Sequence, residues 1–286
     1  MFDLVIHGQN AHLFRSQIQN LTVWEKDNAL RVCQLSFEDA IEIQERAQKA
    51  QLDANLVKSG LSIKEIHVAA FDMDSTLIDL ECIDDIATQI GVGEKVSQMT
   101  ELAMQGHFEF ADFLRQRSHL LKGGTREVIN TTVSHATLMP GALRLMNFLK
   151  ENGVKTYIIS GGFSDIARDV CERLGMDNYL CNELVFDKED KLSGEVTGPA
   201  GGEIIDAAGK RNALAVLCML NHTKLGHAIA VGDGANDLKM LGAAKIGVAY
   251  HAKPIVRDAA TTMLNSVDLM SSLISLLKLG LKTKRF

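Results

Sequence analysis

The chain has 286 residues, of which 46% are hydrophobic, and its formal net charge is -6. This length and apolar fraction fit one buried core of about 200 residues with a smaller second part. The acidic balance, without a basic stripe, argues against nucleic acid as a partner.

The cysteine pattern and the terminal segments indicate a cytoplasmic protein. Five cysteines are present, an odd number without a CxxC pair, so neither a disulfide framework nor a zinc site is indicated. The start of the chain lacks the basic region of a signal peptide. The apolar run 269–281 is too short to span a bilayer, and we expect an amphipathic helix there and no membrane partner.

Residues 1–64 differ in pattern from the rest and predict a small α+β accessory region. Strand-like runs occupy 2–6 and 21–32, and the Ala-, Gln- and Glu-rich stretch 37–56 predicts a helix. Residues 57–60 predict a turn or linker. The region is short for a complete βαββαβ module, so a truncated module, a dimerisation element and a packing extension are all open.

Residues 65–286 predict the main domain, in which short apolar runs alternate with helical stretches. Runs that suit buried parallel strands lie at 67–71, 154–159, 228–231 and 246–249. Helical stretches lie between them, at 142–152, 166–174 and 212–220. The alternation predicts an α/β fold with a doubly wound parallel sheet and ligands at the carboxyl ends of its strands.

Two intervals interrupt this alternation. Residues 80–136 contain helical segments and no convincing strand, which predicts a helical cap over the strand ends. Residues 183–196 have strand-like ends around a polar centre and predict a β-hairpin.

Polar residues follow three of the predicted strands. Asp72 and Asp74 follow the first, a pattern that is equally consistent with a catalytic pair, a turn or a metal loop. The Ser160-Gly-Gly sequence exposes N–H groups to an anion, although an ordinary strand-to-helix turn has the same pattern. The acidic glycine loop 232–237 suits a cation better than a dinucleotide. Ahead of it, either Lys210 or Arg211 could be functional.

Together these pieces are specific. The order DMDST, SGG, lysine and GDGAND resembles the four motifs of the haloacid dehalogenase superfamily of phosphotransferases, over residues 65–278. Within it, the chain is most similar to the phosphoserine phosphatases. That likeness runs through FDMDSTLI, ECID at 81–84, residues 110–122, SGGF, VGDGAND and AKP at 252–254.

The resemblance implies a role for each site residue. Asp72 would be the nucleophile, and Asp74 the general acid and then the general base. The phosphoryl group would be held by Ser160, the Gly161 N–H and Lys210, with Asn236 contacting the phosphate region. Mg²⁺ would be bound by Asp72, the Asp74 backbone carbonyl and Asp233, with Asp237 supporting that set.

In the cap, the resemblance implies that Glu81 meets a substrate ammonium group and Arg117 a carboxylate, while Met104 and Phe110 line the pocket. One anion and one forked cation are what a zwitterionic amino acid requires.

The sequence therefore predicts a Mg²⁺-dependent phosphatase. It would hydrolyse O-phospho-L-serine to L-serine and phosphate through an aspartyl-phosphate intermediate, as the last step of serine biosynthesis. Two alternatives are open: an enzyme for another small phosphomonoester, and a non-catalytic regulatory relative. The second would require a lost nucleophile, lysine or metal aspartate, and none is missing. Whether the protein is a homodimer is also open.

Overall fold

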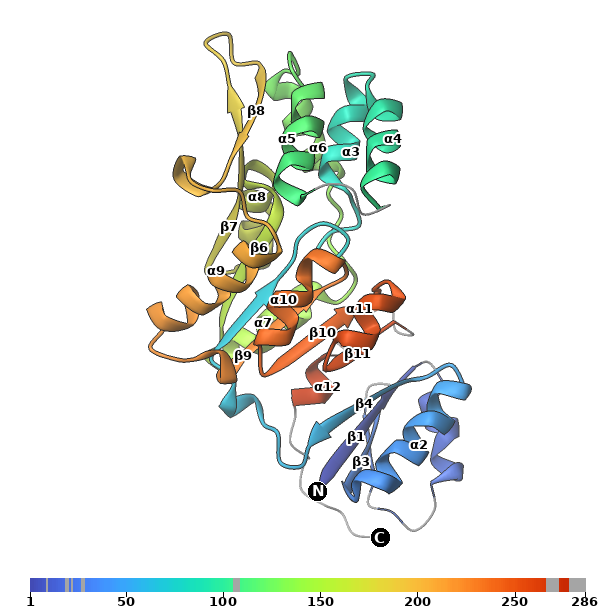
Figure 1. Ribbon diagram of the computed structural model, residues 1–286. Helices are drawn as coiled ribbons and strands as arrows, with labels where there is room; N and C mark the ends of the chain where they lie inside the picture. The colour runs from blue at the N-terminus through green and yellow to red at the C-terminus, as the bar shows by residue number, and fades with distance from the viewer. Residues whose placement is uncertain are drawn as a thin grey trace.

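The computed structural model describes residues 1–8, 10–18, 21, 23–26, 29–104, 109–265 and 273–277, without the side chains of 24–26 and 100–104. The described chain forms a four-stranded sheet in its N-terminal part and a seven-stranded sheet in the remainder. Figure 1 shows the N-terminal domain and the helical cap at opposite ends of the larger sheet. The predicted α/β class with a cap and an accessory domain is confirmed.

The N-terminal domain is a complete βαββαβ module. Its elements are β1 (Phe2–His7), α1 (Ala11–Phe14), β2 (Val23–Lys26), β3 (Ala29–Leu35), α2 (Phe37–Lys49) and β4 (Asp53–Lys58). The strands are antiparallel in the order β2-β3-β1-β4, which is the ferredoxin-like arrangement. The alternative of a truncated module is therefore wrong.

The missed element is β4, which the sequence pattern had placed inside a helix over 37–56. Helix α2 begins at the Ser36 N-cap, whose side chain accepts a hydrogen bond from the Asp39 N–H. It ends at Lys49, because Gln51 takes a left-handed conformation with φ 59° and turns the chain. No glycine or proline marks this end, and the basic residues of the last turn, Arg46 and Lys49, were too weak a signal to place it.

The larger sheet has the order β11-β10-β9-β5-β6-β7-β8. Its strands are β5 (Val68–Phe71), β6 (Lys155–Phe163), β7 (Asn178–Phe186), β8 (Leu192–Thr197), β9 (Ala228–Gly232), β10 (Ile246–Tyr250) and β11 (Thr262–Leu264). All pairs are parallel except β7 with β8, which form the predicted hairpin. Strand β5 lies in the centre and is wholly buried, as expected for a strand covered on both faces.

Helices cover both faces of this sheet. They are α7 (Ala142–Glu151), α8 (Ser164–Leu174), α9 (Ala207–Leu220), α10 (Leu238–Ala243), α11 (Pro254–Ala259) and α12 (Leu273–Leu277). Short 3₁₀ turns lie at Arg15–Gln17, Ile63–Glu65, Pro199–Gly201, Leu225–His227 and Ala235–Asp237. Of the helix expected over 269–281, α12 is the described part; the rest lies outside the described residues. None of the described helices has the length and apolar character that a membrane crossing requires.

The described part of the cap contains four helices that follow β5 in the chain. They are α3 (Cys82–Gln89), α4 (Gly93–Met104), α5 (Phe110–Leu120) and α6 (Arg126–His135). The hairpin supports the cap, because the Gly123 N–H donates to the Leu192 carbonyl and the Leu192 N–H donates to the Gly124 carbonyl. In Figure 1 the cap helices lie beside β8, at one end of the larger sheet.

The N-terminal domain packs against the edge strand β11 of the larger sheet. The Asn55 side chain makes both hydrogen bonds of a β-pair with Met263: Nδ2 donates to its carbonyl at 2.8 Å, and Oδ1 accepts from its N–H at 2.6 Å. Asp53 Oδ2 accepts from the Asn265 N–H at 2.6 Å. The edge of the sheet is thus covered, which protects its unpaired backbone groups.

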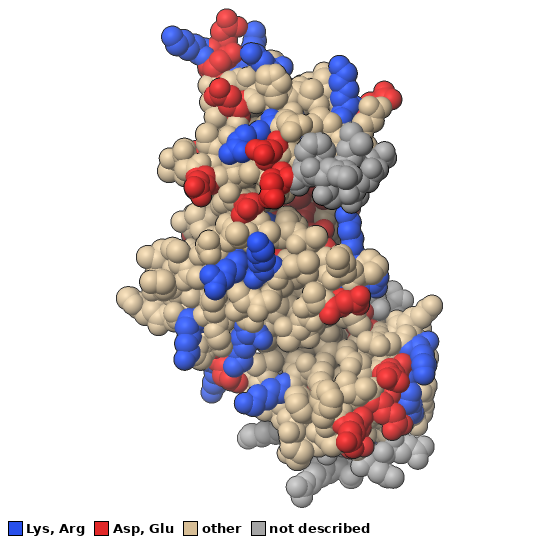
Figure 2. Space-filling view, in the orientation of Figure 1, with Lys and Arg blue, Asp and Glu red and all other residues tan. Residues whose placement is uncertain are grey.

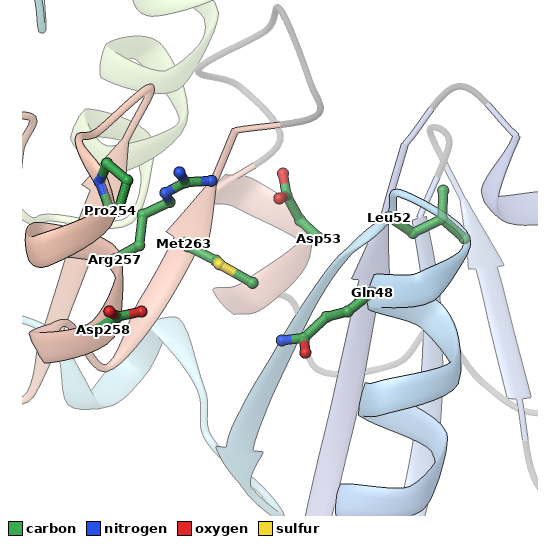
Figure 3. A pocket seen from close by; sticks show the side chains of 7 residues that line it. All are labelled: Gln48, Leu52, Asp53, Pro254, Arg257, Asp258 and Met263. Carbon is green, nitrogen blue, oxygen red and sulfur yellow. The ribbon is translucent and has the colours of Figure 1, made fainter.

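A hollow of about 320 Å³ lies beside this contact, between the two domains. It is lined by Gln48, Leu52, Asp53, Pro254, Arg257, Asp258 and Met263. Figure 3 shows Gln48, Leu52 and Asp53 on the N-terminal domain facing the residues of α11 and β11.

Candidate active site

Three neighbouring strands bring the sequence motifs together. Strand β5 lies between β6 and β9, and all three run in parallel. Asp72 directly follows β5, and its N–H donates to the carbonyl of Val231 on β9. Ser160 lies in β6, and Asp233 directly follows β9. The predicted site residues of the core therefore meet at the carboxyl edge of the sheet.

A sharp turn follows the first motif and separates Asp72 from the cap. Ser75 takes a left-handed conformation, with φ 55°, which is uncommon outside glycine. The N–H groups of the next three residues all donate to the carbonyl of Met73, so the chain folds tightly back on itself. This turn holds Asp74 at the boundary between core and cap.

Lys210 is the cation of the site, and Arg211 is not. Lys210 is wholly buried in the first turn of α9, and its Nζ lies 2.7 Å from Asp72 Oδ2 and 2.7 Å from Asp237 Oδ1. Arg211 is exposed and donates to the neighbouring Asn212. Burial alone would lower the pKa of Lys210, but the Asp237 and Asp72 carboxylates raise it above its ordinary value. Lys210 is therefore a fixed positive charge.

Three carboxylates form a cluster that suits a divalent cation. Asp72, Asp233 and Asp237 each offer an oxygen within 4.8 Å of the others. Burial, and then the negative charge of Asp72, raise the pKa of Asp233 to about 6 and also raise that of Asp237. A cation of hard character, bound by oxygen ligands, would relieve this repulsion, so the residues fit Mg²⁺.

The predicted metal ligands overlap with this cluster. Asp72 and Asp233 belong to it, and Asp237 joins them through its side chain. Gly232 permits this arrangement, because a Cβ there would lie 2.3 Å from the Asp237 Cγ. The Asp74 backbone carbonyl stays a predicted ligand.

Asp74 is held by the first residue of the cap. Cys82 donates to both of its oxygens, from Sγ to Oδ1 at 3.0 Å and from the backbone N–H to Oδ2 at 3.3 Å. Burial, and then the charges of Glu81 and Asp72, raise the pKa of Asp74 to about 8. The raised pKa favours the protonated form of this carboxyl group, which is the form that a general acid requires.

The loop Ser160-Gly161-Gly162 offers polar groups beside these carboxylates. Ser160 is buried, and its Oγ accepts a hydrogen bond from the Gly162 N–H at 3.0 Å. A Cβ at Gly161 would lie 2.7 Å from the Phe110 Cζ, so cap helix α5 closes over this loop. A side chain at position 161 would therefore have to displace the Phe110 ring.

The cap brings a carboxylate and a guanidinium toward the site. Glu81 precedes α3, and its Oε1 accepts from the Ser75 hydroxyl at 2.7 Å. Arg117 lies on α5 with its guanidinium over the Phe113 ring, 4.4 Å from the ring centre. Burial lowers the pKa of Arg117, while Asp84 and Glu81 oppose this.

Some buried polar atoms of the cap have no hydrogen-bond partner among the described residues. Arg117 Nε and Asp84 Oδ1 are buried without a hydrogen-bond partner there. Such groups are expensive unless a ligand completes them.

For two of the predicted site residues, Asn236 and Met104, the structure does not test the predicted contact. Asn236 lies in the turn after β9, next to Asp237, and its contact with phosphate stays a prediction. Met104 ends α4, and its side chain lies outside the described part of the structure.

Sequence reasoning missed three residues that hold the site together. Thr76 Oγ1 donates to Asp233 Oδ1, Cys82 binds Asp74, and Asn182 bonds to the Gly161 carbonyl. Thr76 and Cys82 stand within the FDMDSTLI and ECID segments, which could have drawn attention to them. Nothing in its local sequence distinguishes Asn182.

The face of the molecule that Figure 2 shows carries both signs of charge. On the face in Figure 2, the described Lys and Arg side chains lie interspersed with Asp and Glu. The concentrated charge is instead the buried group of Asp72, Asp233, Asp237 and Lys210.

Comparison with known proteins gives the same assignment over most of the chain. Residues 66–245 match the family described as haloacid dehalogenase-like hydrolase. A phosphoserine phosphatase of Archaeoglobus fulgidus is 37% identical over 249 residues, 86% of this chain and 71% of that protein. The unliganded crystal structure of a probable phosphoserine phosphatase from Vibrio cholerae is similar over 98% of this chain and 90% of that one, with a TM-score of 0.77 and 31% identity.

A further structure, described as a substrate-bound phosphoserine phosphatase complex, is similar over 74% of this chain and 99% of that one, with a TM-score of 0.68 and 31% identity. The Vibrio cholerae structure extends the likeness to the N-terminal domain. The chain belongs to the haloacid dehalogenase-like hydrolases, in the branch that contains these phosphoserine phosphatases.

Proposed function

We propose that the protein hydrolyses O-phospho-L-serine to L-serine and inorganic phosphate, as the last step of serine biosynthesis. The observation that carries the chemistry is geometric: Asp72 is bound by Lys210, and Asp74, two residues away, is held at the boundary with the cap by Cys82. The substrate is supported by the relatives, whose printed names are phosphoserine phosphatase.

In the first half of the reaction, a carboxylate oxygen of Asp72 attacks the phosphorus atom. The bond between phosphorus and the serine oxygen breaks, and Asp74 gives its proton to that oxygen, so serine leaves as a neutral alcohol. The raised pKa of Asp74 supports this role, because it favours the protonated form of the carboxyl group. The phosphoryl group is then bonded to Asp72.

In the second half, a water molecule attacks the phosphorus atom of the aspartyl-phosphate. Asp74, now ionised, takes a proton from this water, and the bond between phosphorus and the Asp72 oxygen breaks. Inorganic phosphate leaves, and both carboxyl groups return to their starting states. The two steps replace one difficult displacement by two easier ones.

Charge repulsion between Asp72 and the phosphate is the main obstacle. Mg²⁺, held by Asp72, Asp233 and the Asp74 carbonyl with support from Asp237, would supply the opposing charge when bound. Lys210 contributes a second positive charge. The remaining phosphoryl contacts come from Ser160, the Gly161 N–H and Asn236.

The cap selects the amino-acid part of the substrate in this proposal. Glu81 receives the ammonium group and Arg117 the carboxylate, which its planar fork can bind through two hydrogen bonds. The buried Arg117 Nε, unpartnered among the described residues, supports this assignment. We place the reaction in the cytoplasm, where the thiols of the five cysteines would stay reduced.

The test is phosphate release by the purified full chain with Mg²⁺ across phosphoserine, phosphoethanolamine and a sugar phosphate. Phosphoserine should be hydrolysed with the highest kcat/KM. A higher kcat/KM for another phosphomonoester would replace the substrate, and no hydrolysis of any would favour a non-catalytic relative.

A further inference from the structure

Asn182 is a buried amide on β7 with a partner at each end. It is wholly inaccessible to solvent; its Nδ2 donates to the Gly161 carbonyl at 2.9 Å, and its Oδ1 accepts from the Ile205 N–H at 2.7 Å. Gly161 belongs to the loop beside Asp72. Ile205 immediately precedes Asp206, the N-cap of the helix α9 that carries Lys210. One side chain thus joins two segments that surround the reacting group.

The pairing of β6 with β7 is irregular at the Ser160–Gly162 loop. Ile159 on β6 lies opposite Leu180 on β7, and Phe163 lies opposite Asn182. Residues 160–162 of β6 therefore stand against the single residue Cys181, so the loop bulges from the ladder at this point. Within this bulge, the Asn182 side chain supplies a hydrogen-bond partner for the Gly161 carbonyl.

The bond to Gly161 also fixes the orientation of one peptide group. The carbonyl of Gly161 and the N–H of Gly162 belong to the same planar unit. Asn182 holds the carbonyl, and Ser160 Oγ accepts from the N–H at 3.0 Å. Without these contacts the two glycines, which tolerate many backbone conformations, would leave this peptide free to rotate.

The fixed orientation of the Gly161–Gly162 peptide group also determines what the Ser160 hydroxyl can do. Because Ser160 Oγ already accepts the Gly162 N–H, its own O–H must point elsewhere and is free to donate to a phosphoryl oxygen. A rotated peptide would remove that constraint and would move the adjacent Gly161 N–H as well.

We infer that Asn182 is a positioning residue for the phosphoryl group. It holds the Ser160–Gly162 loop in its donating geometry and fixes that loop relative to the helix of Lys210. The inference rests on the proposed function, in which these groups bind the phosphoryl oxygens. Asn182 acts only through its neighbours and does not touch the substrate.

The test compares Asn182→Ala and Asn182→Asp with the wild-type chain. Asn182→Asp keeps the size and the acceptor for Ile205 but, when ionised, loses the donor to Gly161. Both variants should lower kcat/KM for phosphoserine by about 10- to 100-fold, the usual effect of losing a supporting contact. The Kd of inorganic phosphate, measured by calorimetry with saturating Mg²⁺, should rise by a similar factor. The Mg²⁺ concentration for half-maximal activity should stay within about twofold.

Asn221→Ala is the matched control, because Asn221 Nδ2 also has two partners, Tyr157 Oη and the Leu217 carbonyl, both at 2.8 Å. It should change stability without changing phosphate affinity. An unchanged phosphate Kd in a folded Asn182 variant, or an equal rise in Asn221→Ala, would overturn the inference. If the wild type binds phosphate but does not hydrolyse phosphoserine, the proposed function fails and the phosphate Kd still decides the role of Asn182.

Discussion

Thr76 donates a hydrogen bond from Oγ1 to Asp233 Oδ1 at 2.9 Å, and so links the turn after β5 to the loop after β9. Thr76 is wholly buried, and this bond opposes the rise in the pKa of Asp233 that burial and Asp72 cause. This hydrogen bond therefore fixes the orientation of the Asp233 carboxylate within the acidic cluster.

Replacing Thr76 by valine should therefore weaken metal binding without changing the shape of the side chain. We expect the Mg²⁺ concentration for half-maximal activity to rise by about 10-fold or more, as for other partners of metal ligands. Thr131→Val is the control, since Thr131 Oγ1 donates to the Glu127 carbonyl on the exposed side of α6, away from the acidic cluster. Equal Mg²⁺ dependence in both variants would contradict this role of Thr76.

Replacing Asp72 by asparagine should abolish turnover while the fold is kept. A carboxamide has a similar shape but is a poor nucleophile, and the loss should be several decades of kcat, as for other essential nucleophiles. Rapid-quench labelling with radioactive phosphoserine should give phosphoprotein with the wild type and none with the variant. Labelled phosphate on Asp72→Asn would assign the nucleophile to another residue.

Metal binding should stabilise the protein more as the pH rises. The pKa of Asp233 is raised from 3.8 to about 6, so without metal the folded state binds a proton more tightly than the unfolded chain. That contribution to stability is complete below pH 3.8 and is lost as the pH rises to about 6. Mg²⁺ requires the deprotonated carboxylate, so its effect is strongest above this window.

Calorimetric Tm values at pH 5, 6, 7 and 8, with and without Mg²⁺, test this sign. The increase in Tm caused by Mg²⁺ should grow from pH 5 to 8 in the wild type and be small throughout in Asp233→Asn. A metal effect that is largest at pH 5 would show that the cluster is not the binding site.

Arg117→Ala should separate substrate selection from phosphate chemistry. If Arg117 binds the substrate carboxylate, kcat/KM for phosphoserine should fall by about 10- to 1000-fold, the loss of a charge-assisted pair in a closed site. Activity on phosphoethanolamine, which lacks the carboxylate, should start low and change little. Arg117→Lys should recover only part of the loss, because lysine cannot present a planar fork.

Arg115→Ala is the matched control on the same helix, since Arg115 is exposed and pairs with Asp112. It should leave both substrates unaffected. An equal loss on both substrates in Arg117→Ala would mean that Arg117 acts on the phosphate or holds the cap.

Asn55→Ala should loosen the N-terminal domain from the core without impairing catalysis. The change removes two hydrogen bonds to Met263 and leaves its backbone groups unpaired, which should cost about 1–3 kcal/mol of unfolding free energy. Urea unfolding and amide exchange at β11 measure this. Asn152→Ala, which loses one hydrogen bond at an exposed helix end, is the control. Equal effects on stability and exchange in the two variants would show that Asn55 does not hold the N-terminal domain to β11.

The order of the catalytic motifs was readable from the sequence because the chemistry constrains residue type. Asp72, Asp74, Ser160 and Asp233 each follow or lie in a short apolar run, and parallel strands bring such positions to one edge. The cap and hairpin were predictable for a related reason, since each interrupts the alternation of strands and helices over a long stretch.

Tertiary structure alone decided the features that depend on contacts between distant segments. The choice of Lys210 over Arg211 follows from which side of α9 faces the sheet, and β4 exists because it pairs with β1. Asn182 reads locally as one polar residue in a strand, and it is functional only because the bulge of β6 lies opposite it. Local propensity reports a residue's neighbours in the chain, whereas these roles are set by burial and hydrogen bonding across the fold.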